Sequence, residues 1–289
     1  MKNCGKLPSD SWSLQSRTTK EVDSDYSPAY KILAVLSPLV LFKIAAFCTL
    51  FVSVLLIQVF GSDAQSAAFM SGDGGSVISI IVYALEAFVG IAVLVPLARC
   101  EYPRLTDDAF RPKRIILTVV ASVATALALN MLFSMTGFTA SDAAYSQVES
   151  EQFGHSLIVG VCLYGVLMPI AEETAFRLLT YNRARRFWGF VPALLISAAI
   201  FGVSHFNLVQ GVYGFLMGIL IVLIYEKFGA FIYAVFAHAS ANCAVYIIMK
   251  SDTLKETVLN VYGLIVCSVI AIISLVLIIT SRRDGHTRQ

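Results

Sequence analysis

The chain has 289 residues, of which 57% are hydrophobic and only 14% are charged. This apolar share exceeds that of a soluble globular domain and predicts an integral membrane protein. The net charge of +2 is too small to suggest a nucleic-acid partner, and no Gly-rich phosphate loop occurs, so neither nucleic acid nor a nucleotide is expected to bind.

Eight apolar stretches are candidate membrane helices, because a hydrocarbon core of about 30 Å needs roughly 20 apolar residues per crossing. In chain order they are 31–60, 76–97, 114–136, 157–180, 191–207, 212–228, 230–250 and 258–280. Very short connections after Trp188 and at Phe228 and Gly229 force the helices on either side to run antiparallel. The sequence therefore predicts an all-α polytopic membrane protein with about eight transmembrane helices.

The distribution of Lys and Arg predicts the orientation of these helices. If both ends of the chain share one compartment, all of the 21 positive residues except Lys43, Lys250 and Lys255 fall on or toward that side. By the positive-inside rule we expect both termini to be cytoplasmic. This topology divides the chain into four segments. Residues 1–30 are a cytoplasmic tail, and residues 31–150 hold the N-terminal helices and the external loop, which begins at 137 and extends to 156. Residues 151–250 form a core, and residues 251–289 hold the last helix and a cytoplasmic tail.

Several polar residues lie inside the predicted spans of the core, where ionisable groups are rare without a partner or a task. Glu172 and Glu173 belong to the segment EETAFR on the fourth span. His205 ends FGVSH on the fifth span, and His238 and Asn242 bound HASAN on the seventh. These five residues are candidates for a functional site.

Each of the three segments also has a purely structural interpretation. Glu173 and Arg177 are four residues apart with the carboxylate first, the favoured order for an ion pair on a helix, and this pair leaves Glu172 without an obvious partner. His205 fits an interfacial histidine at a helix end. His238 and Asn242 share one helix face, so an interhelical hydrogen bond would explain them.

The predicted depth of these residues in the membrane connects the three segments. The two glutamates precede the turn near Gly189 by about as many residues as His205 follows it, which places all three about 24 Å from that turn at roughly 1.5 Å per residue. His238 and Asn242 lie roughly 12 to 18 Å from the same side, and helix tilt can absorb the difference. The five residues are therefore expected to line one intramembrane polar cavity.

Two adjacent carboxylates, two imidazoles and an amide are the parts of a hydrolytic site. A carboxylate in a desolvated pocket can take a proton from water, a histidine can orient that water or protonate the leaving amine, and an amide can donate to the oxyanion. A serine nucleophile is a weaker choice, because no GxSxG segment occurs. No cofactor is needed, although zinc stays possible because His and Glu are acceptable ligands; the HExxH arrangement is absent.

Three other features lie outside this candidate site. Lys43 and Glu86 are charged residues inside the first two spans, and a structural pair explains them as readily as contact with a substrate. Gly211, Gly214 and Gly218 recur at helical spacing on the sixth span. Such small residues are expected to permit close packing against a neighbouring helix.

EETAFR, FGVSH and HASAN resemble the EExxxR, FxxxH and HxxxN/D motifs of the CPBP family, which includes type II CAAX prenyl endopeptidases and Abi proteins linked to bacteriocin processing. The resemblance spans about residues 155–250 and implies an eight-helix intramembrane metalloprotease or glutamic protease. Glu172 would be the catalytic base, with Glu173 in support or paired with Arg177. His205 would position the water or stabilise the tetrahedral intermediate, His238 and Asn242 would complete the oxyanion site, and Phe201 would pack beside His205.

This resemblance leads to an expected function and location. We expect an endopeptidase in a bacterial cell membrane, surrounded by lipid, that cleaves a membrane-associated peptide or protein. Two alternatives from other classes stay open: a non-catalytic partner-binding protein on the same fold, such as an immunity factor or regulator, and a transporter that relays protons through its buried Glu and His residues. The transporter has no support from internal repeats or paired broken helices.

Overall fold

The computed structural model describes residues 26–70, 77–101 and 111–281, and these residues form helices joined by short connections, with no strand among them. The first half contains α2 (Pro28–Phe60), α3 (Asp63–Met70), α4 (Val77–Glu101), α5 (Pro112–Met135), the 3-10 turn η2 (Thr139–Ser141) and α6 (Ala143–Gly154). The second half contains a long rod (α7 to α9, residues 157–188), α10 (Phe190–Val203), α11 (Leu208–Phe228), α12 (Phe231–Met249), α13 (Asp252–Val258) and α14 (Val261–Thr280). The predicted all-α class is confirmed.

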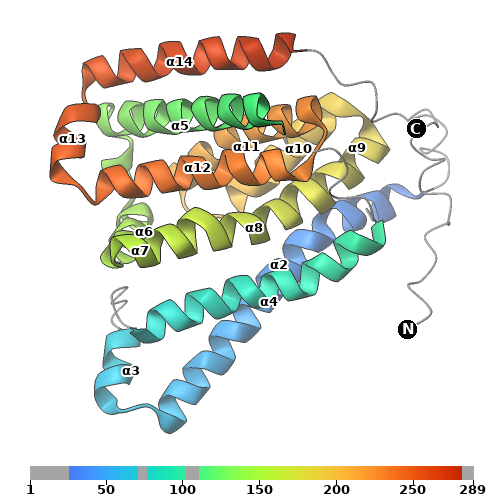
Figure 1. Cartoon of the computed structure of the whole chain (residues 1–289). Coiled ribbons are helices and arrows are strands. Elements are labelled where there is room, and N and C mark those ends of the chain that lie inside the picture. The colour runs from blue at the N-terminus through green and yellow to red at the C-terminus, as the bar shows by residue number, and fades with distance from the viewer. Residues whose placement is uncertain (1–25, 71–76, 102–110, 282–289) are drawn as a thin grey trace.

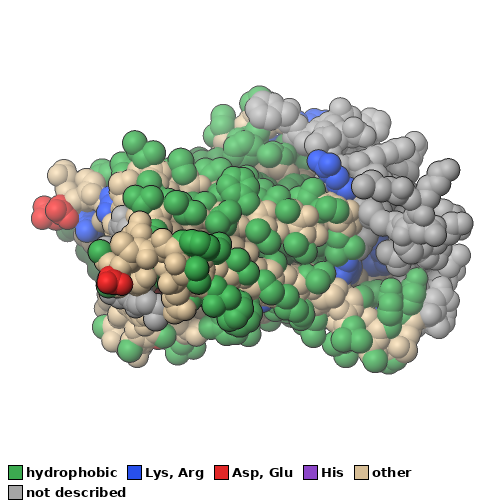
Figure 2. Space-filling model, turned by 90° about the horizontal axis from the view of Figure 1, so that it is seen from below, with side chains coloured by type: hydrophobic (Ala, Val, Ile, Leu, Met, Phe, Trp, Pro, Cys, Tyr) green, Lys and Arg blue, Asp and Glu red, His purple; other side chains and the backbone are tan. Residues whose placement is uncertain are grey.

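Seven of these helices are long and apolar enough to cross a membrane, namely α2, α4, α5, the 157–188 rod, α11, α12 and α14. They run side by side along one direction, and the short elements α3, α6 and α13 gather at one end of the molecule (Figure 1). Hydrophobic side chains cover the middle of the face seen in Figure 2, the Asp and Glu side chains of this face lie toward its left end, and Lys and Arg side chains lie toward both ends. The chain is an integral membrane protein, as the composition predicts.

The predicted fifth span (191–207) is shorter than expected. Its helix, α10, has 14 residues and ends at Val203, which gives a length of about 21 Å at 1.5 Å per residue. Ser204 and His205 form a turn, and Phe206 has a left-handed backbone with φ 57°, so the helix cannot continue. Eight apolar helices are present among the described residues, but α10 is too short to count as a full span.

The predicted antiparallel turns occur where the sequence places them. Gly189 (φ 80°) joins the rod to α10, and Gly229 (φ 75°) joins α11 to α12, so at both places a glycine adopts a backbone conformation that L side chains rarely adopt. The predicted external loop at 137–156 is largely helical instead of irregular, because Asp142 caps α6 by accepting hydrogen bonds from the backbone N–H groups of Ala144 and Tyr145.

The rod at 157–188 is a continuous helix with two π-helical stretches. Its parts are α7 (Leu157–Gly160), the π-helix η3 (Val161–Leu167), α8 (Met168–Glu173), the π-helix η4 (Thr174–Tyr181) and α9 (Asn182–Trp188). A π-helix widens the turn and changes the direction of the side chains, and such stretches are frequent at functional sites. The two glutamates of EETAFR close α8, between the two π-helices.

The α10–α11 hairpin is packed closely by glycines, as the sequence predicts. A Cβ built on Gly202 would lie 2.5 Å from the carbonyl oxygen of Gly211, and one on Gly218 would lie 3.1 Å from the Cα of Ala198. A Cβ on Gly214 would come within 3.3 Å of the ring of His205. The small residues therefore bring the two backbones together and place α11 against the turn that carries His205.

Asp142 fastens the start of α11, next to the turn of this hairpin. Its Oδ1 accepts from the N–H groups of Ala144 and Tyr145 at the start of α6, and its Oδ2 accepts from those of Leu208 and Val209 at the start of α11, all at 2.8–3.2 Å. Desolvation acts to raise the pKa of Asp142, but these four hydrogen bonds outweigh it and hold the pKa below its usual value. One carboxylate thus joins two helix N-termini.

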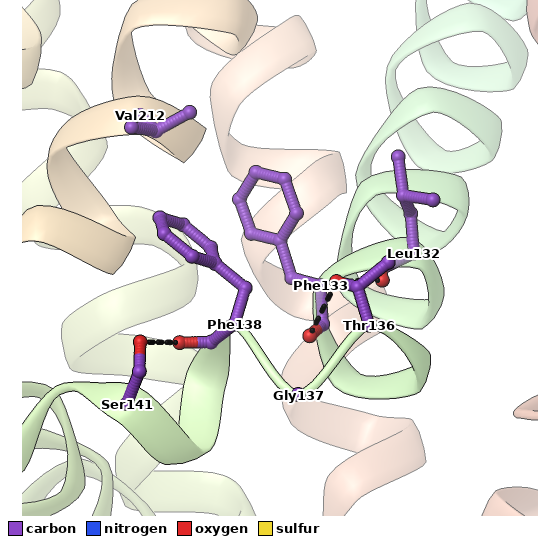
Figure 3. A pocket seen from close by; sticks show the side chains of 7 residues that line it. All are labelled: Leu132, Phe133, Thr136, Gly137, Phe138, Ser141 and Val212. Carbon is purple, nitrogen blue, oxygen red and sulfur yellow. Dashed lines mark hydrogen bonds between the residues drawn. The ribbon is translucent and has the colours of Figure 1, made fainter.

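A pocket of about 600 Å³ lies at the end of α5, near the start of α11 (Figure 3). It is broadly open and mostly apolar, and its lining contains no residue of the candidate site; the lining residues are Leu132, Phe133, Thr136, Gly137, Phe138, Ser141 and Val212. The intramembrane polar cavity expected around the glutamates and histidines is therefore not this pocket, and it stays a prediction.

Candidate active site

Glu173 is the most tightly held residue of the candidate site. Its carboxylate is fully buried, and a single oxygen, Oε1, accepts hydrogen bonds from Nη1 of Arg177 at 2.9 Å and from Nδ1 of His238 at 2.7 Å. Arg177 is four residues further along the same rod, as the sequence predicts, whereas His238 comes from α12. This carboxylate therefore joins two helices, and its position is fixed.

Arg177 is fully buried as well, and its guanidinium lies over the ring of Phe201, 4.4 Å from the ring centroid. Its Nε and Nη2, like Oε2 of Glu173, form no hydrogen bond with the described residues. A buried charge with so few partners is costly, and the cation–π contact with Phe201 supplies part of the compensation.

Glu172 differs from Glu173 in both exposure and partners. Its side chain is 19% exposed, and its Oε2 lies 3.5 Å from Nε2 of His238. The expectation that Glu172 has no obvious partner is therefore wrong, because His238 reaches both glutamates with its two ring nitrogens. The contact with Glu172 is the longer of the two, and this carboxylate keeps access to the space outside the packed core.

Phe201 and His205 form the third side of this cluster. The ring of Phe201 lies edge-on to both imidazoles, with centroid distances of 5.0 Å to His205 and 5.5 Å to His238. Nδ1 of His205 lies 2.9 Å from the backbone carbonyl of Phe201, and since a carbonyl only accepts, Nδ1 carries the proton. In the neutral ring Nε2 is then free to accept a hydrogen bond, and the imidazole interacts electrostatically with Glu172 and His238.

Asn242 lies one turn beyond His238 on α12, and its contact is with a different element. Its Nδ2 donates to the backbone carbonyl of Tyr164 at 2.9 Å. Tyr164 belongs to the π-helix η3, and its hydroxyl lies 3.1 Å from Nε2 of the buried His155. Asn242 therefore holds α12 against the rod, as the interhelical interpretation predicts, and its second N–H is not used by this bond.

The structure thus brings together Glu172, Glu173, Arg177, Phe201 and His238 by direct contacts, with His205 attached through Phe201. The hydrophobic core supports this arrangement, since Phe42 of α2 packs in one cluster with Ala171 and Ala175, which flank the glutamates. No group of three or more His, Cys, Asp or Glu side chains among the described residues has an arrangement that could hold a metal ion.

Two nearby residues were not assigned to the site from sequence. Lys43 of α2 interacts electrostatically with Glu172 and Glu86, and its Nζ lies 5.2 Å from the ring centroid of Phe206. Phe206 follows His205 directly, and its side chain is 79% exposed. Proximity to the FGVSH segment was the only sequence signal for Phe206, and nothing in the sequence linked Lys43 to that segment.

The comparison with protein families bears on the same part of the chain. A family model described as "Type II CAAX prenyl endopeptidase Rce1-like" matches residues 154–244. The chain carries an Rce1-like domain. The recognition of the CAAX protease family from the three motifs is confirmed over this part of the chain.

The Rce1-like domain contains all five residues expected to do the chemistry, from Glu172 to Asn242, together with both π-helices. It falls inside the segment 151–250 expected to form the core, whose boundaries stay a prediction. No curated protein and no solved structure matched the chain.

Proposed function

We propose that the chain is an intramembrane endopeptidase in which Glu172 activates water to hydrolyse a peptide bond of a membrane-associated peptide or protein. The observation that carries this proposal is the unequal environment of the two glutamates. Glu173 is fully buried and fixed by Arg177 and His238, whereas Glu172 is partly exposed and only loosely held at 3.5 Å from His238. Glu172 is therefore the carboxylate that can change partners during a reaction.

The reaction follows from these contacts. Glu172 accepts a proton from water as the water oxygen attacks the carbonyl carbon of the substrate, and the oxygen of that carbonyl becomes an oxyanion. The proton then passes to the nitrogen of the leaving amine as the C–N bond breaks, which leaves a carboxylate and an amine as products. The imidazoles of the buried His238 and the half-buried His205 support this proposal, because each ring can accept from the water through Nε2, and an imidazolium form of His238 would donate from Nε2 to the oxyanion.

The supporting residues have separate roles in this proposal. Glu173 holds Nδ1 of His238 so that Nε2 faces Glu172, and Arg177 balances the charge of Glu173. The ring of Phe201 contacts Arg177 and both imidazoles, and its backbone carbonyl fixes the protonated nitrogen of His205. Asn242 holds α12 to Tyr164, and its remaining N–H is a candidate donor for the oxyanion.

The proposed setting is a bacterial cell membrane. The positions of Lys and Arg support an orientation in which both termini are cytoplasmic. The substrate is a peptide or a membrane protein that approaches from the lipid. A prenylated peptide ending in a CAAX sequence is the first to test, because the matched family is described by that chemistry, and apolar peptides without a prenyl group are the comparison.

Cleavage by the purified full chain in proteoliposomes tests the proposal. Peptides of both kinds are incubated with wild type, Glu172→Gln and the control Glu256→Gln, and the products are identified by mass spectrometry. Glu256 is an exposed residue on α13, away from the site. We expect cleavage by wild type and the control but not by Glu172→Gln. Equal cleavage by all three would refute the proposal, and a cellular phenotype that survives replacement of both glutamates would favour the non-catalytic regulator.

A further inference from the structure

Phe206 has an unusual backbone for its residue type. It is the only non-glycine residue with a positive φ (57°) among the residues that the structure describes. The left-handed position after a helix normally takes Gly or Asn, because the side chain of a bulky residue clashes there with its own backbone. A strained position that keeps an aromatic ring points to a task for the ring itself.

The position of the ring identifies that task. Phe206 directly follows His205, and its side chain is 79% exposed, so one face of the ring is available for contact beside the candidate site. The Nζ of Lys43 lies over the ring, 5.2 Å from its centroid. Lys43 follows Phe42, whose ring packs against the glutamate-bearing rod and against Gly90 of α4. The packing of α2 therefore sets the ammonium at this place.

The ammonium of Lys43 has charges near it but no acceptor. Glu172 and Glu86 both attract it electrostatically, yet within the described residues it forms neither a hydrogen bond nor an ion pair. An ammonium has three N–H donors, and the cation–π contact with Phe206 uses none of them as a conventional hydrogen bond. These donors can therefore reach an oxygen acceptor on a molecule that contacts Phe206.

We propose that Phe206 and Lys43 form a substrate-binding clasp beside His205. In this clasp an apolar side chain of the substrate packs on the exposed face of Phe206, and Lys43 donates to a nearby carboxyl or carbonyl oxygen of the same peptide. A helix interior cannot supply that oxygen, because its carbonyls are already paired. The ligand is therefore an extended apolar peptide or the end of one.

This inference rests on the proposed peptidase function, and a binding measurement separates the two. Each variant is made in a Glu172→Gln background, so that no cleavage occurs, and incorporated into lipid nanodiscs. The probe is a fluorescent peptide that ends in a prenylated Cys-Val-Ile-Ala, used as the free acid and as the C-terminal amide, with Kd measured by anisotropy. Cleavage of the same peptides by the protein with Glu172 intact is measured in parallel.

Loss of either member of the clasp is expected to weaken binding without unfolding the protein. Phe206→Gly and Lys43→Met should each raise Kd about tenfold, the loss typical of an anchoring side chain. Lys43→Arg should keep most of the affinity. The melting temperature of Phe206→Gly should not fall, because glycine relieves the strained backbone. The matched control is Phe60→Ala, since Phe60 is 81% exposed at the far end of α2 and should leave Kd unchanged.

The two peptide forms identify the acceptor. If Lys43 binds the terminal carboxylate, the amide peptide should bind more weakly than the free acid, and Lys43→Met should not weaken binding of the amide further. If Lys43 binds an internal carbonyl, both peptides should bind with the same Kd, and Lys43→Met should weaken the binding of both. An unchanged Kd in both Phe206→Gly and Lys43→Met would overturn the clasp. Normal binding without cleavage in the unmodified protein would instead overturn the peptidase proposal and leave the clasp in place.

Discussion

At the scale of single residues, the main result is that two adjacent glutamates have different environments. The sequence predicted the pair of Glu173 with Arg177 from their spacing, because two residues four apart meet on any helix. It could not predict that His238 contacts both carboxylates, since that contact depends on how α12 packs against the rod. The buried pair of Glu173 and Arg177 is therefore tested through protein stability, and the partly exposed Glu172 is tested through cleavage.

Removal of Arg177 alone should destabilise the protein strongly. Arg177→Met leaves Glu173 as a buried charge without its cation, and breaking a buried pair in this way costs about 3–5 kcal/mol. The double variant Glu173→Gln with Arg177→Met removes both charges and should be less destabilised than the single variant. Thermal unfolding in detergent measures both, and a single variant as stable as wild type would show that the pair contributes nothing.

Asp142 gives a prediction about pH. Its pKa is lower in the folded protein than in the unfolded chain, so its contribution to stability is complete above the unfolded pKa of about 4 and is lost as the pH falls through the folded pKa. Asp142→Asn has only one accepting oxygen and can cap α6 or α11 but not both. The melting temperature of this variant should lie below that of wild type at pH 7, and the difference should shrink below about pH 4.

At the scale of the elements, the helices and the tight turns were predictable, whereas their internal irregularities were not. Hydrophobic length identifies a membrane helix, and the glycines at 189 and 229 mark the turns. The π-helices η3 and η4 leave no such pattern in the sequence, and they lie where the rod packs against α12 and α2. The early end of α10 also escaped prediction, because the apolar stretch continues past Val203 through a residue with positive φ.

The close packing of the α10–α11 hairpin can be tested with two alanines. Gly202→Ala places a methyl group 2.5 Å from the carbonyl oxygen of Gly211, and both helix backbones must move apart, at a cost of about 1–3 kcal/mol. His205 would move with them, so cleavage should also fall.

Gly211→Ala is the matched control, because its nearest contact would be 3.6 Å and alanine favours the helix. Melting temperature and cleavage rate are measured for both variants. If Gly202→Ala behaves like Gly211→Ala, close approach of the two backbones does not position His205.

At the scale of the whole molecule, the proposed orientation places the two ends of each membrane-spanning helix on opposite sides of the membrane. Lys113 lies in the first turn of α5, and Ser146 lies on α6, which is at the opposite end of the molecule from the start of α5 (Figure 1). Both side chains are exposed. In a cysteine-free background, a membrane-impermeant thiol reagent applied to intact cells should label Ser146→Cys and not Lys113→Cys. The reverse pattern would invert the topology.

The central claim is that Glu172, and not its fixed neighbour, activates water. The most direct test is the single-turnover cleavage rate of Glu172→Gln, measured with enzyme in excess over a peptide that wild type cleaves. The account predicts a rate at least about 10²-fold below that of wild type, the size of a lost general base, with unchanged melting temperature and peptide Kd. A rate within about twofold of wild type would contradict it.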